Sequence, residues 1–178
     1  MNVKVWCASV VTALLLLPQG ALGQDRRDVK VAEEVCRVLS SYPRLTIFDD
    51  IGASVENGAV AITGKVTMPY KKHDLEKRIA GIDGVRSVRN EIDVLPVSQY
   101  DEELRYRVAR AIYGNASFWN YAAMANPPIH VIVERGRVTL AGVVNSNVER
   151  ALARSLATGL GEMSVTNALK TDAEVRTE

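Results

Sequence analysis

Hydrophobic residues recur with a helical period in two separate stretches of the chain. Within each stretch they are mostly three or four positions apart, the spacing that places side chains on one face of an α-helix. The apolar positions are Val31, Val35, Val38 and Leu39 in the first stretch and Leu104, Val108, Ala111 and Ile112 in the second. Asp28 and Asp101 stand three residues before these stripes, where a carboxylate can cap the helix or oppose its N-terminal dipole. We therefore expect two amphipathic helices that begin near these aspartates.

A repeated strand pattern follows each predicted helix. "VENGAVAITGKV" (residues 55–66) aligns without a gap on "VERGRVTLAGVV" (133–144), with the shared frame V-E-x-G-x-V-x-[IL]-x-G-x-V. Apolar residues alternate with polar or small ones, which is typical of half-buried strands. Asn57-Gly58 is a strong hairpin-turn signal because both residues tolerate positive φ, whereas Arg135-Gly136 supplies only the glycine. Each repeat thus contains a predicted β-hairpin.

Each repeat closes with a second helix and a third strand. Leu75 and Ile79 align with Leu152 and Leu156 on the helix, and "SVRNEI" aligns with "SVTNAL" on the strand. The crossover helix brings the last strand alongside the hairpin. The predicted fold class is α+β: two tandem α-β-β-α-β units, each a small mixed three-stranded sheet with two helices on one face. We place the units at residues 28–95 and 101–171, with a linker at 96–100 and a disordered tail at 172–178.

The two hairpins, each after an amphipathic helix and before a V-x-N strand, resemble those of BON domains. The resemblance covers nearly all of the chain after residue 23. It implies a noncatalytic binding role in the bacterial cell envelope, connected with envelope or osmotic stress, phospholipid membranes and larger envelope assemblies. "GIDGVRSVRNEI" is close to the family's ending, whereas "GLGEMSVTNAL" has Glu162-Met163 where the first copy has Val85. The resemblance does not identify the ligand.

Residues 1–23 are expected to form a secretory signal peptide. Lys4 precedes the apolar run "VVTALLLLP", and Ala21 and Gly23 supply small residues before a cleavage point at Gln24. The apolar run is too short to cross a bilayer as a helix, although a retained anchor is the alternative. We therefore expect a periplasmic or secreted protein that is soluble after cleavage of the signal peptide.

The distribution of charges along the chain is more informative than the net charge. The chain has 22 basic and 21 acidic side chains, and cleavage would remove Lys4 and leave a neutral protein. We therefore expect no nucleic acid partner. Between Lys65 and Arg89 there are seven basic residues and three acidic ones. This basic face favours contact with anionic lipid headgroups, although an ordinary solvated helix explains the same charges.

Side chains suited to catalysis or metal binding are scarce. His73 and His130 are the two histidines, and Cys36 would be the one cysteine left after cleavage. We interpret His130 as an outward ring beside a strand and Cys36 as a buried thiol. No serine lies in a nucleophile-elbow motif and no glycine-rich phosphate loop precedes a helix. We therefore expect no enzyme activity, no cofactor and no metal.

The stretch "YGNASFWNYAAMANPPIHV" (residues 113–131) is rich in aromatics. The matching connection of the first repeat is shorter but also has two aromatic residues, Tyr42 and Phe48. Aromatics in this connection can plug the open edge of each small core, so we expect Tyr113 and Tyr121 to be buried. The remaining two aromatics, Phe118 and Trp119, belong to the added length and are the surface candidates.

Two functional hypotheses follow for the whole chain. In the leading hypothesis, the protein binds anionic phospholipid surfaces. The basic residues attract the headgroups and the aromatic residues enter the interface. The candidate lipid-binding residues are Lys71, Lys72, Lys77, Arg78, Phe118 and Trp119. In the alternative, the chain is a protein–protein adaptor within an envelope assembly, with one repeat bound to an envelope protein and the other setting spacing or joining a homo-oligomer.

Overall fold

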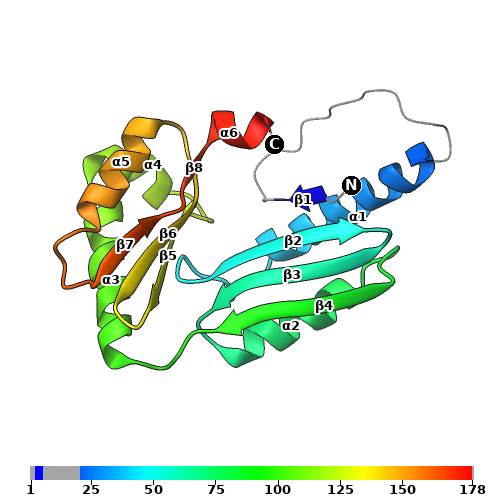
Figure 1. Cartoon of the computed structure of the whole chain (residues 1–178), viewed down its shortest axis with the longest axis horizontal. Helices are drawn as coiled ribbons and strands as arrows, with labels where there is room; N and C mark the ends of the chain where they lie inside the picture. The colour runs from blue at the N-terminus through cyan, green and yellow to red at the C-terminus, as the bar shows by residue number, and fades with distance from the viewer. Residues whose placement is uncertain (1–2, 6–20, 178) are drawn as a thin grey trace. The chain divides into compact units, whose positions relative to one another are not determined.

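The computed structural model describes residues 3–5 and 21–177, which belong to two compact units (Figure 1). Of the described residues, those up to 44 and 51–94 form the first unit, and 45–50 and 95–177 form the second. Most of the predicted signal peptide, residues 1–23, lies outside the described residues, so its cleavage stays a prediction. In the described part of the chain, no helix is long and apolar enough to cross a membrane.

The first unit has the predicted α-β-β-α-β order. Its sheet has the strand order β1-β2-β3-β4, in which β3 and β4 are parallel. The turn between β2 and β3 is at Asn57-Gly58, where φ is 53° and 75°. Val3–Val5 adds a strand antiparallel to β2 that the alternation did not predict. The elements are β1 (Val3–Val5), α1 (Ala21–Ser40), β2 (Asp50–Glu56), β3 (Ala59–Val66), α2 (Pro69–Ala80) and β4 (Ser87–Val94).

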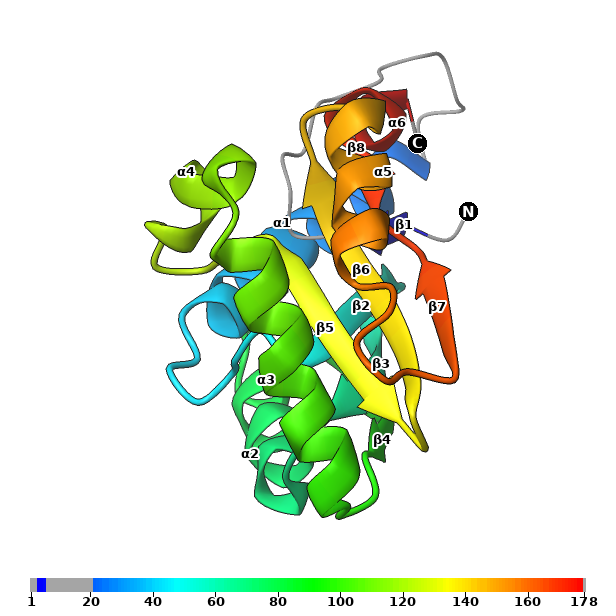
Figure 2. The same cartoon turned by 90° about the vertical axis from the view of Figure 1, so that its left-hand side faces the viewer.

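The second unit repeats this order with additions. Its strands have the order β5-β6-β7, with β5 antiparallel and β7 parallel to β6, and β8 pairs further along β6. Figure 2 shows its two long helices, α3 and α5, on the same face of the sheet. The elements are α3 (Gln99–Tyr113), η1 (Ala116–Phe118), α4 (Trp119–Ala122), β5 (Ile129–Glu134), β6 (Arg137–Val144), α5 (Asn147–Leu156), β7 (Ser164–Asn167), β8 (Lys170–Thr171) and α6 (Asp172–Thr177).

Each unit buries its own apolar core between sheet and helices. The inward positions predicted from alternation are buried in both hairpins, for example Val55 and Ile62 in the first and Val133 and Leu140 in the second. Burial of one such side chain contributes about 1.5–3 kcal/mol. The strand period therefore identified the core face of both hairpins correctly.

A buried carboxylate joins the first helix of each unit to the tip of its hairpin. Asp28 accepts hydrogen bonds from the backbone N–H groups of Asn57 and Gly58 at 2.7 and 2.9 Å. Asp101 accepts from Arg135 and Gly136 in the same way, both at 2.7 Å. The sequence suggested that these aspartates cap their helices. Instead they bind the hairpin turns, and this explains how Arg135 is held at a φ of 51° without an asparagine or glycine.

The N-terminus of α3 is capped by a different residue. The Ser98 hydroxyl accepts a hydrogen bond from the backbone N–H of Asp101, which lies within the helix. Asp28 likewise lies inside α1 and not at its start. Because Gln99 is already helical, α3 also begins within the predicted linker at 96–100.

An asparagine on the last strand forms a second repeated contact. The side-chain amide of Asn90 donates to the Lys72 carbonyl at 2.9 Å, and that of Asn167 donates to the Arg150 carbonyl at 2.8 Å. Lys72 therefore corresponds to Arg150. This equivalence shifts the predicted alignment of α2 and α5 by one residue.

The buried positions of the second helices agree with the shifted alignment. Leu75 and Ile79 correspond to Ala153 and Ala157, and all four are fully buried. The predicted partners Leu152 and Leu156 are half-buried beside the core. The alignment was wrong because small alanines occupy the inward positions, where the apolar pattern favours the larger leucines.

A short segment of the first repeat packs in the second unit. In residues 45–50, the Ile47 carbonyl accepts a hydrogen bond from the Val131 N–H of β5 at 2.7 Å. The Phe48 ring meets Tyr106 edge-on, with centroids 5.2 Å apart. Both aromatics of this connection were expected to plug the first core. Tyr42 is buried there, but Phe48 packs against the second core because the outer strand β5 offers an unpaired N–H beside it.

The C-terminal residues 172–178 were predicted to be disordered, and this is wrong for 172–177, which form α6. Thr171 and Glu174 form a reciprocal cap: the Thr171 N–H donates to the Glu174 carboxylate at 2.8 Å, and the Glu174 N–H donates to the Thr171 hydroxyl at 3.4 Å. This T-x-x-E pattern is a helix-start signature. Arg150 of α5 also binds Glu174 at 3.0 Å.

We expect Asp101→Ala to lower the free energy of unfolding of the second unit by about 2–4 kcal/mol, because two turn N–H groups lose a charged acceptor. Asp28→Ala should do the same to the first unit. Urea denaturation followed by circular dichroism measures both effects. Glu102→Ala, which removes an exposed acid from the same helical turn, is the matched control. Equal effects of Asp101→Ala and Glu102→Ala would contradict this role.

Candidate functional site

The aromatic loop, which we define as residues 114–128, joins α3 to β5 and carries η1 and α4. Between Arg110 and His130 the chain has no Asp, Glu, Lys or Arg residue. Trp119 is 72 % exposed and Met124 is 48 % exposed. Figure 2 shows α4 beyond the C-terminal end of α3, to one side of the sheet. The loop therefore presents an uncharged surface with one large aromatic side chain.

The aromatic loop is fixed to the second core by its other aromatic residues. Phe118 is fully buried, and its ring stacks on Tyr121 with centroids 5.9 Å apart. The Tyr121 hydroxyl donates to the Glu149 carboxylate of α5 at 2.7 Å and accepts from the Asn145 N–H at 3.0 Å. Before the loop, the Tyr113 hydroxyl donates to the Ile129 carbonyl at 2.6 Å. The expected burial of Tyr121 is confirmed, and Tyr113 is half-buried against the same core.

One of the two surface candidates of the loop is exposed and the other is buried. Trp119 is exposed as expected, but exposure of Phe118 was wrong. The reason is local: Asn115 accepts a hydrogen bond from Ser117 N–H and starts η1, and this turn directs Phe118 inward beside Ile112 and Ile129 of the same core. Phe118 is therefore a core residue and is not available to a ligand.

The four basic candidates of the first unit also differ in their exposure to solvent. Lys71 is buried, and its amine donates to the Thr67 hydroxyl at 2.8 Å. The Lys72 amine donates to the Ile92 carbonyl at 2.7 Å, next to the Asn90 contact. Lys77 is exposed, and so is Arg78, whose guanidinium lies 5.0 Å from the centre of the Tyr42 ring. Of these four candidates, Lys77 and Arg78 thus remain open to solvent.

The other singled-out residues do not gather into a reactive centre. His130 is half-buried and not outward, and its Nδ1 is a buried atom without a hydrogen-bond partner. Burial raises the pKa of Asp50, and the charge of His130 opposes that rise. Cys36 is half-buried rather than fully buried. Among the described residues, no three His, Cys, Asp or Glu side chains form a group that could hold a metal ion.

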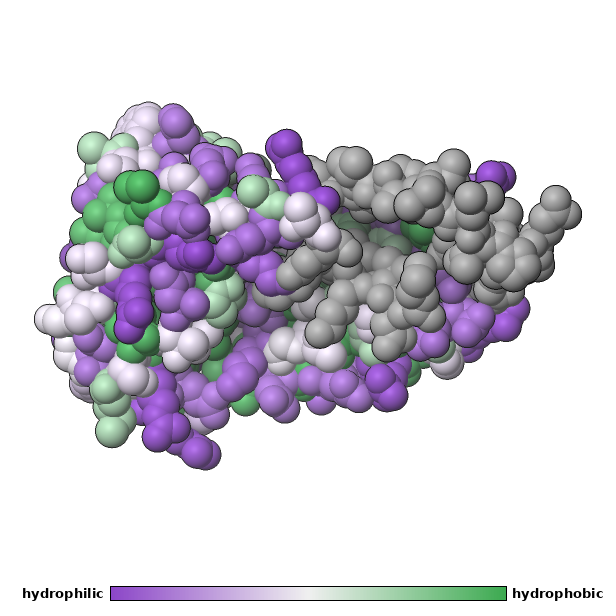
Figure 3. All heavy atoms as spheres, turned by 45° about the horizontal axis from the view of Figure 1, so that its top comes forward, coloured by the Kyte–Doolittle hydropathy of each residue, from purple (hydrophilic) through white to green (hydrophobic). Residues whose placement is uncertain are grey.

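Several apolar side chains of the second unit are exposed. Figure 3 shows hydrophobic side chains in patches among hydrophilic ones, instead of an evenly polar exterior. Exposed apolar residues of this unit outside the aromatic loop include Val148 on α5 and Met163 before β7. Single exposed apolar residues are common in proteins. The aromatic loop differs because its exposed apolar residues lie in a stretch of sequence without a charged side chain.

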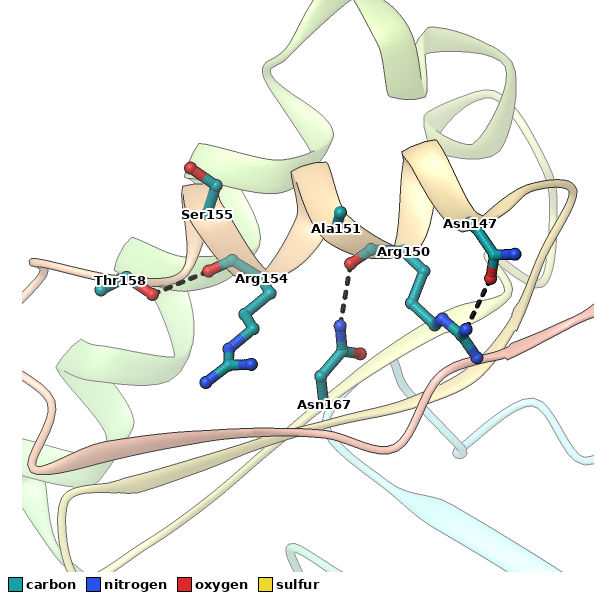
Figure 4. A pocket seen from close by; sticks show the side chains of 7 residues that line it. All are labelled: Asn147, Arg150, Ala151, Arg154, Ser155, Thr158 and Asn167. Atoms are coloured by element: carbon teal, nitrogen blue, oxygen red, sulfur yellow. Dashed lines mark hydrogen bonds between the residues drawn. The ribbon is translucent and has the colours of Figure 1, made fainter.

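Sequence reasoning missed a groove between α5 and β7 of the second unit (Figure 4). Its volume is about 530 Å³, and Arg150 and Arg154 line it together with polar residues of both elements. The signal was present in the sequence, because Asn147, Arg150 and Arg154 are three and four residues apart and share one face of a helix. The predicted alignment, shifted by one residue, obscured it.

We expect Phe118→Ala to lower the free energy of unfolding by about 3–5 kcal/mol, because it empties a fully buried site. Trp119→Ala should change it by less than about 0.5 kcal/mol, because the Trp119 side chain is mostly in solvent. Urea denaturation of the two variants side by side tests this division. Similar losses in both variants would mean that Trp119 also belongs to the core.

Tyr121 gives a prediction for alkaline pH. Burial, and then the hydrogen bond to Glu149, raise the pKa of Tyr121 to about 12. The pKa of Tyr121 in the folded protein is above the ordinary value of 10, so its protonated hydroxyl contributes fully to the free energy of unfolding below pH 10. This contribution is lost as the pH rises towards 12. We expect wild type to lose on the order of 2 kcal/mol more than Tyr121→Phe over this range. Parallel losses in thermal melts of the two proteins would contradict the assignment.

Comparison with known proteins places the chain in a family. The family model of the BON domain matches residues 27–96 and 101–173. No curated protein matches the chain. Among solved structures, the chain is similar to CdsD, a structural protein of the type III secretion system of Chlamydia trachomatis, at 13 % identity and a TM-score of 0.30 over 82 % of this chain and 94 % of that one. A second structure, the C-terminal domain of CdsD, matches at 13 % identity and a TM-score of 0.28, over 77 % and 94 % of the two chains. Because the two BON matches span both repeats, the chain belongs to the BON-domain family, with one domain in each repeat.

Proposed function

We propose that this protein is an exported envelope module that binds phospholipid membrane surfaces through the aromatic loop of its second BON domain. BON domains are noncatalytic binding domains associated with envelope proteins. The predicted signal peptide supports delivery to the periplasm or the exterior. The family resemblance extends the proposal to protection against envelope or osmotic stress.

The observation that carries the proposal is the exposed Trp119 in a loop without charged residues. A tryptophan ring is favoured at the boundary between headgroups and acyl chains, where its apolar body and its N–H group both find suitable surroundings. A charged side chain nearby would have to lose its water when the loop entered that boundary. Between Arg110 and His130 the loop carries no Asp, Glu, Lys or Arg side chain.

The construction of the aromatic loop also favours insertion. Phe118 and Tyr121 hold the short helix α4 on the core, so the backbone around Trp119 is already ordered before any contact with lipid. A preordered loop loses less conformational entropy on binding than a flexible one. Exposed Met124 and the alanines beside it can accompany Trp119 into the interface.

Exposed cations of each domain can add electrostatic attraction to an anionic membrane. Arg110 is exposed at the base of the loop, and Lys77 and Arg78 are exposed in the first domain. Each cation held near an anionic membrane surface contributes on the order of 1 kcal/mol, and salt screens this attraction. Lys71 and Phe118 are buried and are not part of the proposed surface.

Vesicle binding tests the proposal on residues 24–178, which contain both matched domains. Residues 24–178 contain one tryptophan, Trp119, because the other tryptophan, Trp6, precedes residue 24. We expect its fluorescence to shift to the blue on phosphatidylglycerol vesicles and to be quenched by brominated lipid, more strongly at low salt than at moderate salt. In cosedimentation, Trp119→Glu should weaken binding by about tenfold or more, the loss that corresponds to one large apolar side chain.

The matched control is Met163→Glu. Met163 is an equally exposed apolar residue of the same unit. It lies beside Gly136 at the hairpin tip, whereas the aromatic loop follows the opposite end of α3. Vesicle binding should survive this change. Absence of binding to anionic vesicles at both salt concentrations would rule the lipid function out, and a protein partner recovered by crosslinking in cells would then favour the adaptor.

A further inference from the structure

The groove between α5 and β7 presents hydrogen-bond donors and positive charge. Figure 4 shows the side chains that line it, from six positions on or just after α5 and one on β7: Asn147, Arg150, Ala151, Arg154, Ser155, Thr158 and Asn167. None of the described lining residues is acidic. An oxyanion is the class of ligand that such a surface suits, because its oxygens accept several hydrogen bonds at once.

Arg150 is held in place at one end of the groove. Its guanidinium donates to both carboxylate oxygens of Glu174 at 3.0 Å and to the Asn147 side-chain oxygen. Asn167 fixes the helix backbone at the same point through the Arg150 carbonyl. These contacts orient the planar guanidinium before a ligand arrives, and among the described residues its Nε–H has no acceptor.

Arg154 is the uncompensated cation of the groove. It is exposed, and in the described part of the chain its guanidinium has no hydrogen bond and no carboxylate partner. Figure 4 shows the guanidinium groups of Arg154 and Arg150 projecting from α5 on either side of Asn167. Arg150 already has the Glu174 carboxylate as its partner. A bound anion would supply the negative partner that Arg154 lacks.

In the first BON domain, an acidic side chain occupies the position that is equivalent to Arg154. Asn90 corresponds to Asn167, and Glu76 corresponds to Arg154. There the Glu76 carboxylate accepts a hydrogen bond from the Asn90 amide at 2.9 Å, so an acidic group of the protein itself fills the position. In the second domain the acid is replaced by Arg154, and the Asn167 amide donates to the Arg150 carbonyl alone.

From this exchange we infer that the groove between α5 and β7 binds a phosphate group, with Arg154 and Arg150 as its charged ligands. Asn147, Ser155 and the Asn167 amide supply neutral donors around it. Two guanidinium planes suit a tetrahedral group with several oxygens better than a single carboxylate. The phosphate can belong to a soluble phosphoester or to a phospholipid headgroup. This inference uses none of the residues of the aromatic loop and does not rest on the membrane function.

Nitrogen-15 NMR of residues 24–178 titrated with glycerol 3-phosphate tests the site without a membrane. We expect saturable shifts of the Arg154 side-chain Nε–H and of backbone amides 147–158. Arg154→Glu recreates the closed arrangement of the first domain and should weaken binding by about tenfold or more. Arg137→Glu makes the same charge change at an exposed position on β6 and is the matched control.

Four outcomes separate the possibilities. Loss of glycerol 3-phosphate binding in Arg154→Glu but not in Arg137→Glu supports the site. If Arg154→Glu also weakens cosedimentation with phosphatidylglycerol vesicles, the phosphate is that of a headgroup. If vesicle binding is unchanged, the ligand is a soluble phosphoester. Shifts that do not saturate, or that are equally large in wild type and Arg154→Glu, would overturn the inference, whatever the result of the Trp119 experiment.

Discussion

The contact on which both BON domains depend is the carboxylate of the first helix that binds the tip of the hairpin. Asp28 and Asp101 each satisfy two backbone N–H groups of a turn whose residues have positive φ. The contact ties the first helix of each domain to the tip of its hairpin. It also explains why the turn sequence can change from Asn57-Gly58 to Arg135-Gly136, since the charged acceptor offsets the cost of placing arginine in the left-handed region.

On this shared frame the two domains have different surfaces. The residue before each aspartate is Arg27 in the first domain and Tyr100 in the second. The Tyr100 hydroxyl donates to the Gly161 carbonyl and its ring covers the hairpin turn, whereas Arg27 lines an open groove at the matching place. The Glu162 carboxylate binds the N–H groups of Gly159 and Leu160, and the Gly159 contact holds the pKa of Glu162 below its usual range. Because the core contacts are repeated, substitutions at these surface positions leave the fold unchanged.

The sequence predicted most of the fold because the helices and hairpins follow simple periods. The predictions were wrong where two neighbouring side chains of similar character compete for one buried position. Adjacent residues at 152–153 are both apolar, and tertiary packing alone chooses Ala153 for the buried position. Phe118 and Trp119 are both aromatic, and the η1 turn decides which one faces the core. The packing of Phe48 in the second unit depends on contacts distant in sequence. Helix α6 is a different case, because the T-x-x-E capping pattern at Thr171 and Glu174 predicts its start from the sequence alone.

The exposure of Trp119 is itself an argument for function. The loop already has Phe118 and Tyr121 to fill the core, and these two side chains fix its backbone. A third aromatic residue, 72 % exposed, adds little to folding and favours aggregation if it has no partner. Tyr121 also ties the loop to α5 through Glu149, the residue before Arg150. The loop that carries the exposed tryptophan and the helix that lines the cationic groove are therefore joined directly within the second domain.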